Sequence, residues 1–394
     1  MTSEWRTIRA ADFIDFNPRL SLKKGDIATK VAMDKLKPFT KKIPETEKAE
    51  FNGGAKFCNG DTVMARITPC LENGKTAYVD MLDDGEIGFG STEFIVMRAK
   101  TGISDPQFVY YTAISPVFRN VAIKSMVGSS GRQRVQQSVL EELELSVPDL
   151  EEQRRIGAFL ARIDEKIALN DRINDNLEQQ AQSYFQELFV DNANPEWTTG
   201  TISDLGAVVG GSTPSKAKPE YYTESGIAWI TPKDLSINKS KFVSHGENDI
   251  TELGLKNSSA AIMPEGTVLF SSRAPIGYIA IAAGEVTTNQ GFKSVVPKPE
   301  IGTPFVYFFL KNTLPVIEGM ASGSTFKEVS GSTMKNVPAV IPDAETLAKF
   351  SDFCAPIFAQ QRILEEQNQS LATLRDNLLP KLMSGEIDVS AVQL

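Results

Sequence analysis

Two long stretches of the sequence repeat apolar residues at alternating spacings of four and three, and this pattern constrains the fold more than any other. The first stripe runs from Ile156 to Leu188 and the second from Leu347 to Leu382. Such spacing is typical of long helices that pack at a coiled-coil seam, and the other stripe of the same chain is the candidate partner of each. The seam residues that we expect to pack are Ile156, Leu160, Ile163, Ile167, Leu177, Tyr184, Ile357, Leu364, Leu371 and Leu378.

Polar residues interrupt both stripes, and the second stripe also contains two prolines. Pro356 lies within the second stripe and predicts a kink or a late helix start there, and Pro380 predicts a bend near its end. Polar seam residues lower stability but can fix the register and orientation of two helices. Those residues are Asn170, Asn174, Gln361 and Asn368.

Charge separates the stripes from the rest of the chain. The net charge is −9, yet residues 149–192 carry five basic against ten acidic residues, and residues 343–394 carry four against eight. Residues 1–148 carry 20 basic against 19 acidic residues, and residues 193–342 carry 12 against 13. The acidic excess is thus confined to the predicted helices. The overall charge therefore does not exclude a nucleic-acid partner for the larger segments.

The two larger segments resemble each other, which predicts an internal repeat. Both combine short β-like runs, such as 93–97 and 278–282, with helical stretches at 106–121 and 304–318. Both pass through a Gly-Ser loop and a Val-Pro-Asp or Ile-Pro-Asp motif into a heptad stripe. We therefore predict an α+β chain with pseudo-two-fold character. Its segments are a globular domain at 1–148, a helix at 149–192, a second domain at 193–342, and a helix with a tail at 343–394.

Composition and motif spacing argue against most enzyme classes. The single histidine, His245, lies in a polar loop, so a His-rich metal site is excluded. The Gly-Lys-Thr motif ending at Thr76 has Pro69 where a phosphate-binding loop requires glycine. Asp149, Asp164 and Lys166 resemble a metal-dependent nuclease set, but Asp164 and Lys166 point to different sides of one helix. The sequence contains no run of 18 apolar residues, so no membrane-spanning helix is predicted. The three scattered cysteines fit a reducing cytoplasm.

Basic and polar loops recur in both large segments and are the candidates for contact with nucleic acid. Lysine and arginine neutralise phosphates, whereas arginine, asparagine and glutamine can hydrogen-bond to base edges. Individually, each of these residues could equally be an ordinary solvated surface side chain. The candidates are Lys23, Lys24, Arg66, Lys75, Ser129, Ser130, Arg132, Gln133, Arg134, Ser212, Thr213, Ser215, Lys216, Lys218, Arg273, Asn289, Gln290, Lys293, Thr325 and Lys327.

Several motifs together resemble the specificity subunit of type I restriction-modification systems across essentially the whole chain. They include Gly210-Gly-Ser-Thr-Pro-Ser-Lys216, Trp229-Ile-Thr-Pro-Lys-Asp-Leu235 and Asn289-Gln-Gly-Phe-Lys293. The helix boundaries match as well, at Val147-Pro-Asp-Leu-Glu-Glu-Gln153 and Leu374-Arg-Asp-Asn-Leu-Leu-Pro-Lys-Leu-Met-Ser-Gly-Glu-Ile387. The first domain is more divergent, and Phe16-Asn-Pro18 and Lys24-Gly25 are its recognisable marks.

The resemblance implies a non-catalytic reader of double-stranded DNA, located in the cytoplasm. Each large segment would be a target recognition domain for one half of a bipartite, asymmetric site. Two antiparallel helices would separate the domains, set the spacer and dock two modification subunits. The chain itself would bind no cofactor or metal. S-adenosylmethionine would come with the modification subunits, and ATP and Mg²⁺ with a restriction subunit where one is present.

Two other interpretations of the same residues remain open. A coiled-coil scaffold whose domains bind protein would show no dependence on DNA sequence. A nuclease that uses Asp149, Asp164 and Lys166 would cut DNA alone in the presence of a metal ion.

Overall fold

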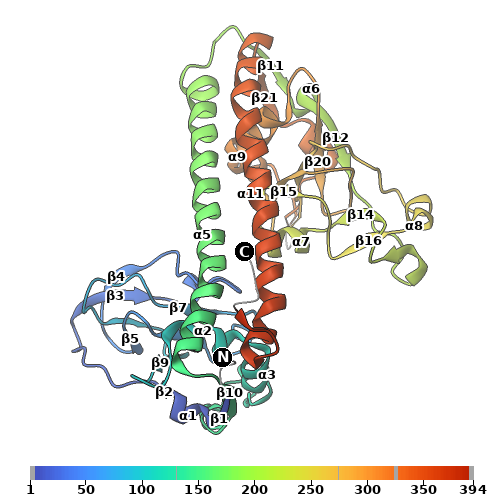
Figure 1. Cartoon of the computed structure of the whole chain (residues 1–394). Coiled ribbons are helices and arrows are strands. Elements are labelled where there is room, and N and C mark those ends of the chain that lie inside the picture. Colours follow the sequence, from blue (N-terminus) through green and yellow to red (C-terminus); the bar gives the residue numbers. More distant parts are fainter. Residues whose placement is uncertain (1–4, 130, 274, 324–326, 390–394) are drawn as a thin grey trace. The chain divides into compact units, whose positions relative to one another are not determined.

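The chain folds into two compact units. The computed structural model describes residues 5–129, 131–273, 275–323 and 327–389 (Figure 1). Unit 1 comprises Met1–Leu169 and Gln367–Leu394, and unit 2 comprises Asn170–Glu366. Each unit holds one globular domain and part of each of two long helices, α5 (Leu150–Gln186) and α11 (Ala344–Ser384). The boundary between the two compact units thus falls within both long helices. The division of the chain into four segments, made from the sequence, stays a prediction.

The globular domain of unit 1 contains two four-stranded sheets, one antiparallel and one mixed. One sheet has the order β2 (Ile14–Phe16), β9 (Phe94–Ala99), β6 (Thr62–Ala65), β7 (Thr76–Tyr78). The other has the order β4 (Glu47–Glu50), β3 (Ile27–Val31), β8 (Gly88–Gly90), β5 (Ala55–Phe57). β1 (Arg6–Arg9) pairs with β10 (Glu144–Val147) directly before α5. The helical turns are α1 (Ala10–Phe13), η1 (Met33–Lys35), α2 (Pro106–Ile114), α3 (Pro116–Lys124) and α4 (Gln137–Glu141).

The globular domain of unit 2 repeats this plan. One sheet has the order β12 (Gly206–Gly210), β20 (Lys293–Pro297), β17 (Val268–Phe270), β18 (Ile279–Ala282), β15 (Phe242–Val243). The other has the order β13 (Tyr222–Thr223), β16 (Asn248–Ile250), β14 (Ile227–Ile230), β19 (Thr287–Thr288). β11 (Thr198–Thr201) pairs with β21 (Pro338–Ile341) directly before α11. The longest helix of this domain is α9 (Thr303–Gly319). The shorter helical segments are η2 (Glu187–Asp191), α6 (Ile202–Leu205), η3 (Pro219–Tyr221), α7 (Pro232–Ile237), α8 (Glu252–Lys256) and α10 (Gly331–Lys335).

In each unit one hydrophobic core joins the globular domain to the long helices. Phe108 and Tyr111 of α2 pack in one cluster with Ile156 and Leu160 of α5 and Leu382 of α11. The corresponding cluster of unit 2 combines residues of α9 with residues from the opposite ends of the same two helices. Its largest members include Phe185, Phe305, Phe308 and Phe350. Burial of large apolar side chains is the main favourable contribution to folding. Each domain is therefore anchored to the helices by its own core.

Side-chain contacts show that α5 and α11 run antiparallel within each unit. In unit 1 Arg375 of α11 pairs with Asp164 of α5. Asn368, which precedes Arg375 in α11, donates to the carbonyl of Ile167, which follows Asp164 in α5. In unit 2 the amide of Gln361 donates to the carbonyl of Asn174. Farther along α5, the ring of Tyr184 contacts that of Phe353, which lies earlier in α11, with 4.5 Å between the ring centroids and 54° between the ring planes. The predicted fold class, with its repeat and its antiparallel pair of long helices, is confirmed.

Of the two alternatives expected at Pro356, the late helix start was wrong, and the helical stretch expected at 106–121 is interrupted. α11 does not start late at Pro356, because it begins at Ala344, where the Asp343 carboxylate accepts a hydrogen bond from the backbone of Thr346. Pro356 and Asp352, whose carbonyl loses its helical donor, are both exposed, so water can satisfy that carbonyl. The stretch predicted as one helix at 106–121 is two helices, because Pro116 ends the first and Ser115 caps the second.

Among the residues that the structure describes, no helix is both long enough and apolar enough to span a lipid bilayer.

Candidate nucleic-acid interface

In unit 2 the loops after β12 and β19 meet, and they bring four of the predicted residues together. The backbone N–H of Ser212 donates to the carbonyl of Thr288 at 2.9 Å, and the Thr213 hydroxyl hydrogen-bonds to the Gln290 side chain. A Cβ on Gly211 would lie 2.1 Å from the Asn289 carbonyl oxygen, so only glycine permits this approach. We call the group formed by Ser212, Thr213, Asn289 and Gln290 the polar ridge. Within it, Gln290 is exposed and Asn289 is half-buried.

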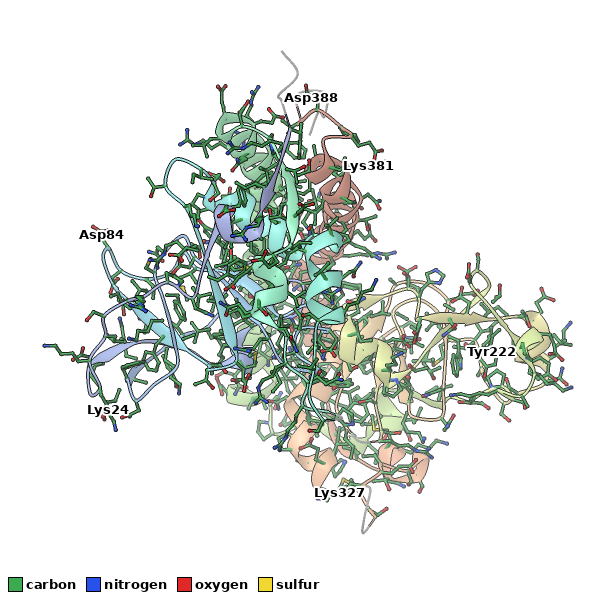
Figure 2. All side chains as sticks on the ribbon, turned by 90° about the horizontal axis from the view of Figure 1, so that it is seen from below. Lys24, Asp84, Tyr222, Lys327, Lys381 and Asp388 are labelled. Atoms are coloured by element: carbon green, nitrogen blue, oxygen red, sulfur yellow. The ribbon has the colours of Figure 1, made fainter. Side chains whose placement is uncertain are left out.

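A second group of predicted residues adjoins this ridge and is built around Glu328. Arg273 pairs with Glu328 at 3.0 Å, and the Lys293 ammonium lies 3.9 Å from the same carboxylate. Lys293 also donates to the carbonyl of Gln290, which links the two groups. Burial lowers the pKa of Lys293, against the opposing effect of Glu328. Lys327, labelled in Figure 2, is exposed beside Glu328.

The remaining predicted residues of unit 2 are separate from these groups or outside the described residues. Ser215, Lys216 and Lys218 are exposed in the loop that precedes η3, where the Lys218 ammonium lies 5.3 Å from the centre of the Tyr221 ring. Thr325 lies outside the described residues.

In unit 1 the predicted Arg134 is held by an acidic neighbour. Its guanidinium donates to both carboxylate oxygens of Glu93 at 2.6 to 3.0 Å. Hydrogen bonds from Arg134 lower the pKa of Glu93. The backbones of Arg134 and Val127 hydrogen-bond to each other, and Gln133 accepts from the backbone of Thr68. Arg134 is thus half-exposed and oriented, rather than a free surface cation.

Arg66 lines a hollow of about 560 Å³ in unit 1, whose lining includes residues of β9 in the first sheet and of β5 in the other sheet. Arg19 and Lys56 also line it, with no carboxylate among its lining residues. Arg66 donates to the carbonyl of Val135, whereas its buried Nε has no hydrogen-bond partner among the described residues. The sequence interpretation missed Arg19 and Lys56. The signal for Arg19 was its place directly after Phe16-Asn-Pro18, where β2 ends.

The other predicted residues of unit 1 do not gather around this hollow. Lys24 is exposed in the loop between β2 and β3 (Figure 2), and the backbone of its neighbour Lys23 donates to Asp26. Lys75 is half-buried and donates to the carbonyl of Met33, which makes it part of the domain's internal bonding. Ser129 and Arg132 are exposed, and Ser130 lies outside the described residues.

The predicted seam residues lie along the contact between the long helices and the domains. The buried ones are Ile156, Leu160 and Ile163 in unit 1 and Ile357 and Leu364 in unit 2. The partly buried ones pack against the two main cores and are Ile167, Leu371, Leu378, Leu177 and Tyr184.

The two aspartates of the nuclease interpretation have structural partners, whereas Lys166 is exposed. Asp164 is buried, and it accepts hydrogen bonds from Arg375 at 2.7 Å and from the Tyr111 hydroxyl at 2.6 Å. Asp149 accepts from the backbone of Glu152 at the start of α5. In the described part of the chain, no three His, Cys, Asp or Glu side chains gather as metal ligands. His245 is mostly exposed, 3.3 Å from Asp249.

The sequence pattern of one protein family covers most of the chain. The family is described as "Type I restriction modification DNA specificity domain", and it matches twice, at residues 3–179 and 194–374. The chain belongs to this family. Each of the two matches takes in one globular domain and continues into the long helix that follows it. The predicted role in DNA recognition is therefore confirmed, and with it the assignment to a recognition subunit rather than to an enzyme.

Curated relatives and a solved structure agree with this assignment. The MjaIX specificity subunit of Methanocaldococcus jannaschii is 39% identical over 194 residues, which cover 47% of this chain and 45% of that protein. The HindI specificity subunit of Haemophilus influenzae is 25% identical over 407 residues, and the match covers 83% of this chain and 86% of that protein. The S subunit of a type I system from M. genitalium has the same fold, with a TM-score of 0.58, 18% identity and 96% coverage of both chains.

Proposed function

We propose that this chain reads a bipartite, asymmetric site in double-stranded DNA, with one half-site for each globular domain. The observation that supports this most is that the two domains carry different polar side chains on their loops. In unit 1 Arg19 and Arg66 line the hollow, whereas in unit 2 Asn289 and Gln290 belong to the polar ridge. Arginine pairs best with guanine, and asparagine or glutamine with adenine. Two unlike sets of loop residues would therefore read unlike half-sites.

In this proposal the predicted residues divide into two classes. Exposed lysines, such as Lys24, Lys216 and Lys327, contact phosphates and give affinity without sequence preference. The residues of the polar ridge and of the hollow contact base edges. Arg134 and Arg273, each fixed by a carboxylate, stand beside those base-reading residues in a set orientation.

The long helices set the spacer and dock the modification subunits. α5 has 37 residues, so it is about 55 Å long, against about 34 Å for one turn of DNA. Half-sites about one turn apart, with unread base pairs between them, are compatible with that length. The acidic excess of both helices makes them poor DNA ligands and suits them to contact with protein. Two modification subunits with their S-adenosylmethionine, and a restriction subunit with ATP and Mg²⁺, complete the assembly in the cytoplasm.

Methylome sequencing of cells with and without the chain tests this function. We expect one bipartite methylated motif to disappear when the gene for this chain is deleted and to return with a plasmid copy. Q290A should return a motif that is altered in one half only. A methylome that does not respond to the chain would contradict the proposal and favour a scaffold that binds protein.

A further inference from the structure

Each globular domain buries one lysine against the long helices, and the proposed function does not use either lysine. Lys41 in unit 1 is 6% exposed and Lys241 in unit 2 is 7% exposed. Lysine is almost never buried so completely unless it is paired. The two residues occupy corresponding places, because their carbonyls accept hydrogen bonds from Tyr78 of β7 and Ile281 of β18. These strands pair with β6 and β17 in the first sheet of each domain.

Lys241 contacts both long helices at once. Its ammonium donates to Glu178 of α5 at 2.7 Å and to Gln361 of α11 at 2.8 Å. The backbone N–H groups of Lys241 and Phe242 donate to the two carboxylate oxygens of Glu365, also on α11. Four hydrogen bonds therefore join this short segment to the two helices. A rotation of the domain on the helices would break these bonds together.

Lys41 reaches the same two helices through a tyrosine. Its ammonium lies 3.3 Å from the Tyr111 hydroxyl, which donates to Asp164 of α5 at 2.6 Å. Arg375 of α11 binds the other oxygen of Asp164 at 2.7 Å. The ammonium also lies 5.0 to 5.5 Å from the centres of three tyrosine rings, which favours a cation there.

The lysine is repeated between the two units, but the carboxylate that faces it is not. Aligning Pro148-Asp149 with Pro342-Asp343 places Asp164 opposite Phe358 and Glu178 opposite Ala372. Each unit thus supplies its acid from a position that the other fills with an apolar residue. A contact formed twice from different helix positions is not a simple by-product of the repeat.

We propose that Lys41 and Lys241 are positioning residues, each of which fixes the orientation of its recognition domain on the paired helices. They thereby fix the direction in which the DNA-contacting loops of that unit face. This inference rests on the proposed function. An apolar side chain would fill the same space at a lower cost of desolvation, but it would supply no directional bond. Loss of the charge should therefore loosen the orientation without unfolding the domain.

Methionine is a suitable replacement because it keeps the unbranched stem and leaves no carboxylate unpaired. Without Lys241, Glu178 still pairs with Lys311 at 2.5 Å. Without Lys41, Asp164 still pairs with Arg375. The variants K41M and K241M should consequently melt within about 2 °C of the parent chain. K166M, which alters an exposed lysine of α5, is the matched control.

The test measures how strictly the assembled complex with its modification subunits requires its natural spacer. Binding is measured at pH 7 on duplexes that contain the methylated motif with its own spacer or with one base pair more or fewer. We expect the parent complex and K166M to prefer the natural spacer at least tenfold. K41M and K241M should reduce that preference to threefold or less while they keep the half-site sequences. K41R and K241R, which keep the charge, should restore part of the preference.

Three results would count against the inference. An unchanged spacer preference in folded K41M and K241M would refute a positioning role. A lowered melting temperature, with affinity lost equally on every duplex, would show that the lysines only stabilise the fold. If the parent complex discriminates no sequence at all, the proposed function fails and the inference fails with it.

Discussion

Replacement of Arg375 by methionine should destabilise unit 1 strongly, because the buried carboxylate of Asp164 would lose its ion-pair partner. Arg375 and Asp164 pair at 2.7 Å, with side chains only 9% and 6% exposed. Burial alone would lower the pKa of Arg375, but Asp164 and Asp376 raise it above its ordinary value. Removal of one member of a buried ion pair typically costs about 3–5 kcal/mol. In R375M, Asp164 would keep the Tyr111 hydroxyl and the more distant Lys41.

The loss should appear in urea unfolding followed by circular dichroism and in thermal melting. At about 2–4 °C per kcal/mol for a unit of this size, the expected drop in melting temperature is roughly 6–20 °C. D164N/R375M should recover at least half of the lost free energy, because asparagine carries no charge and still accepts from Tyr111.

R362M is the matched control, since Arg362 of the same helix pairs with Glu265 and Glu366 near the surface. An exposed pair of this kind is worth about 1 kcal/mol or less. If R375M costs less than 1 kcal/mol, or no more than R362M, the Arg375–Asp164 pair does not hold α11 against α5 in the way described here.

Three further predictions concern charge, recognition and helix length. Burial lowers the pKa of Lys41 and of Lys241 to about 8, below the 10.5 of an exposed lysine. The unfolded chain therefore binds more protons between these values, so the free energy of unfolding should rise with pH from about 8 to about 10.5. In K41M/K241M that rise should be smaller, and an equal rise in urea titrations would contradict the assignment. R132A/R134A should lower the affinity for one half-site about tenfold in competition binding and leave the other unchanged. An equal loss of affinity for both half-sites would refute the assignment of one half-site to each domain. Removal of one heptad from both α5 and α11 should change the spacer found by methylome sequencing but not the half-site sequences, and an unchanged spacer would exclude the helices as its determinant.

The long helices were predictable from the sequence because their pattern is local. Apolar residues that recur every three or four positions define a helix face wherever it packs, so the stripes at 156–188 and 347–382 located α5 and α11. Helix boundaries depend on single bonds that a periodicity does not encode. The cap formed by Asp343 and the break at Ser115–Pro116 are both of this kind.

The candidate interface was only partly predictable, because its geometry joins residues distant in sequence. The basic loops were found from their composition, but the acids that orient them were not. Glu93 lies far from Arg134 in the sequence, as Glu328 does from Arg273, and no local pattern connects them. Lys41 is one of four lysines at positions 35 to 42, and nothing in the local sequence distinguishes it as the buried one. Its burial becomes visible only when Tyr111 and Asp164 are brought beside it.

The way the chain threads through the two units has a consequence for its synthesis on the ribosome. Unit 2 is one continuous segment, whereas unit 1 needs both the beginning of the chain and its last residues after Glu366. Unit 2 can therefore finish folding first, while the earlier-made unit 1 waits for Arg375 and Leu382 to emerge. A chain that ended after Glu366 would contain all of unit 2, whereas unit 1 would lack its part of α11.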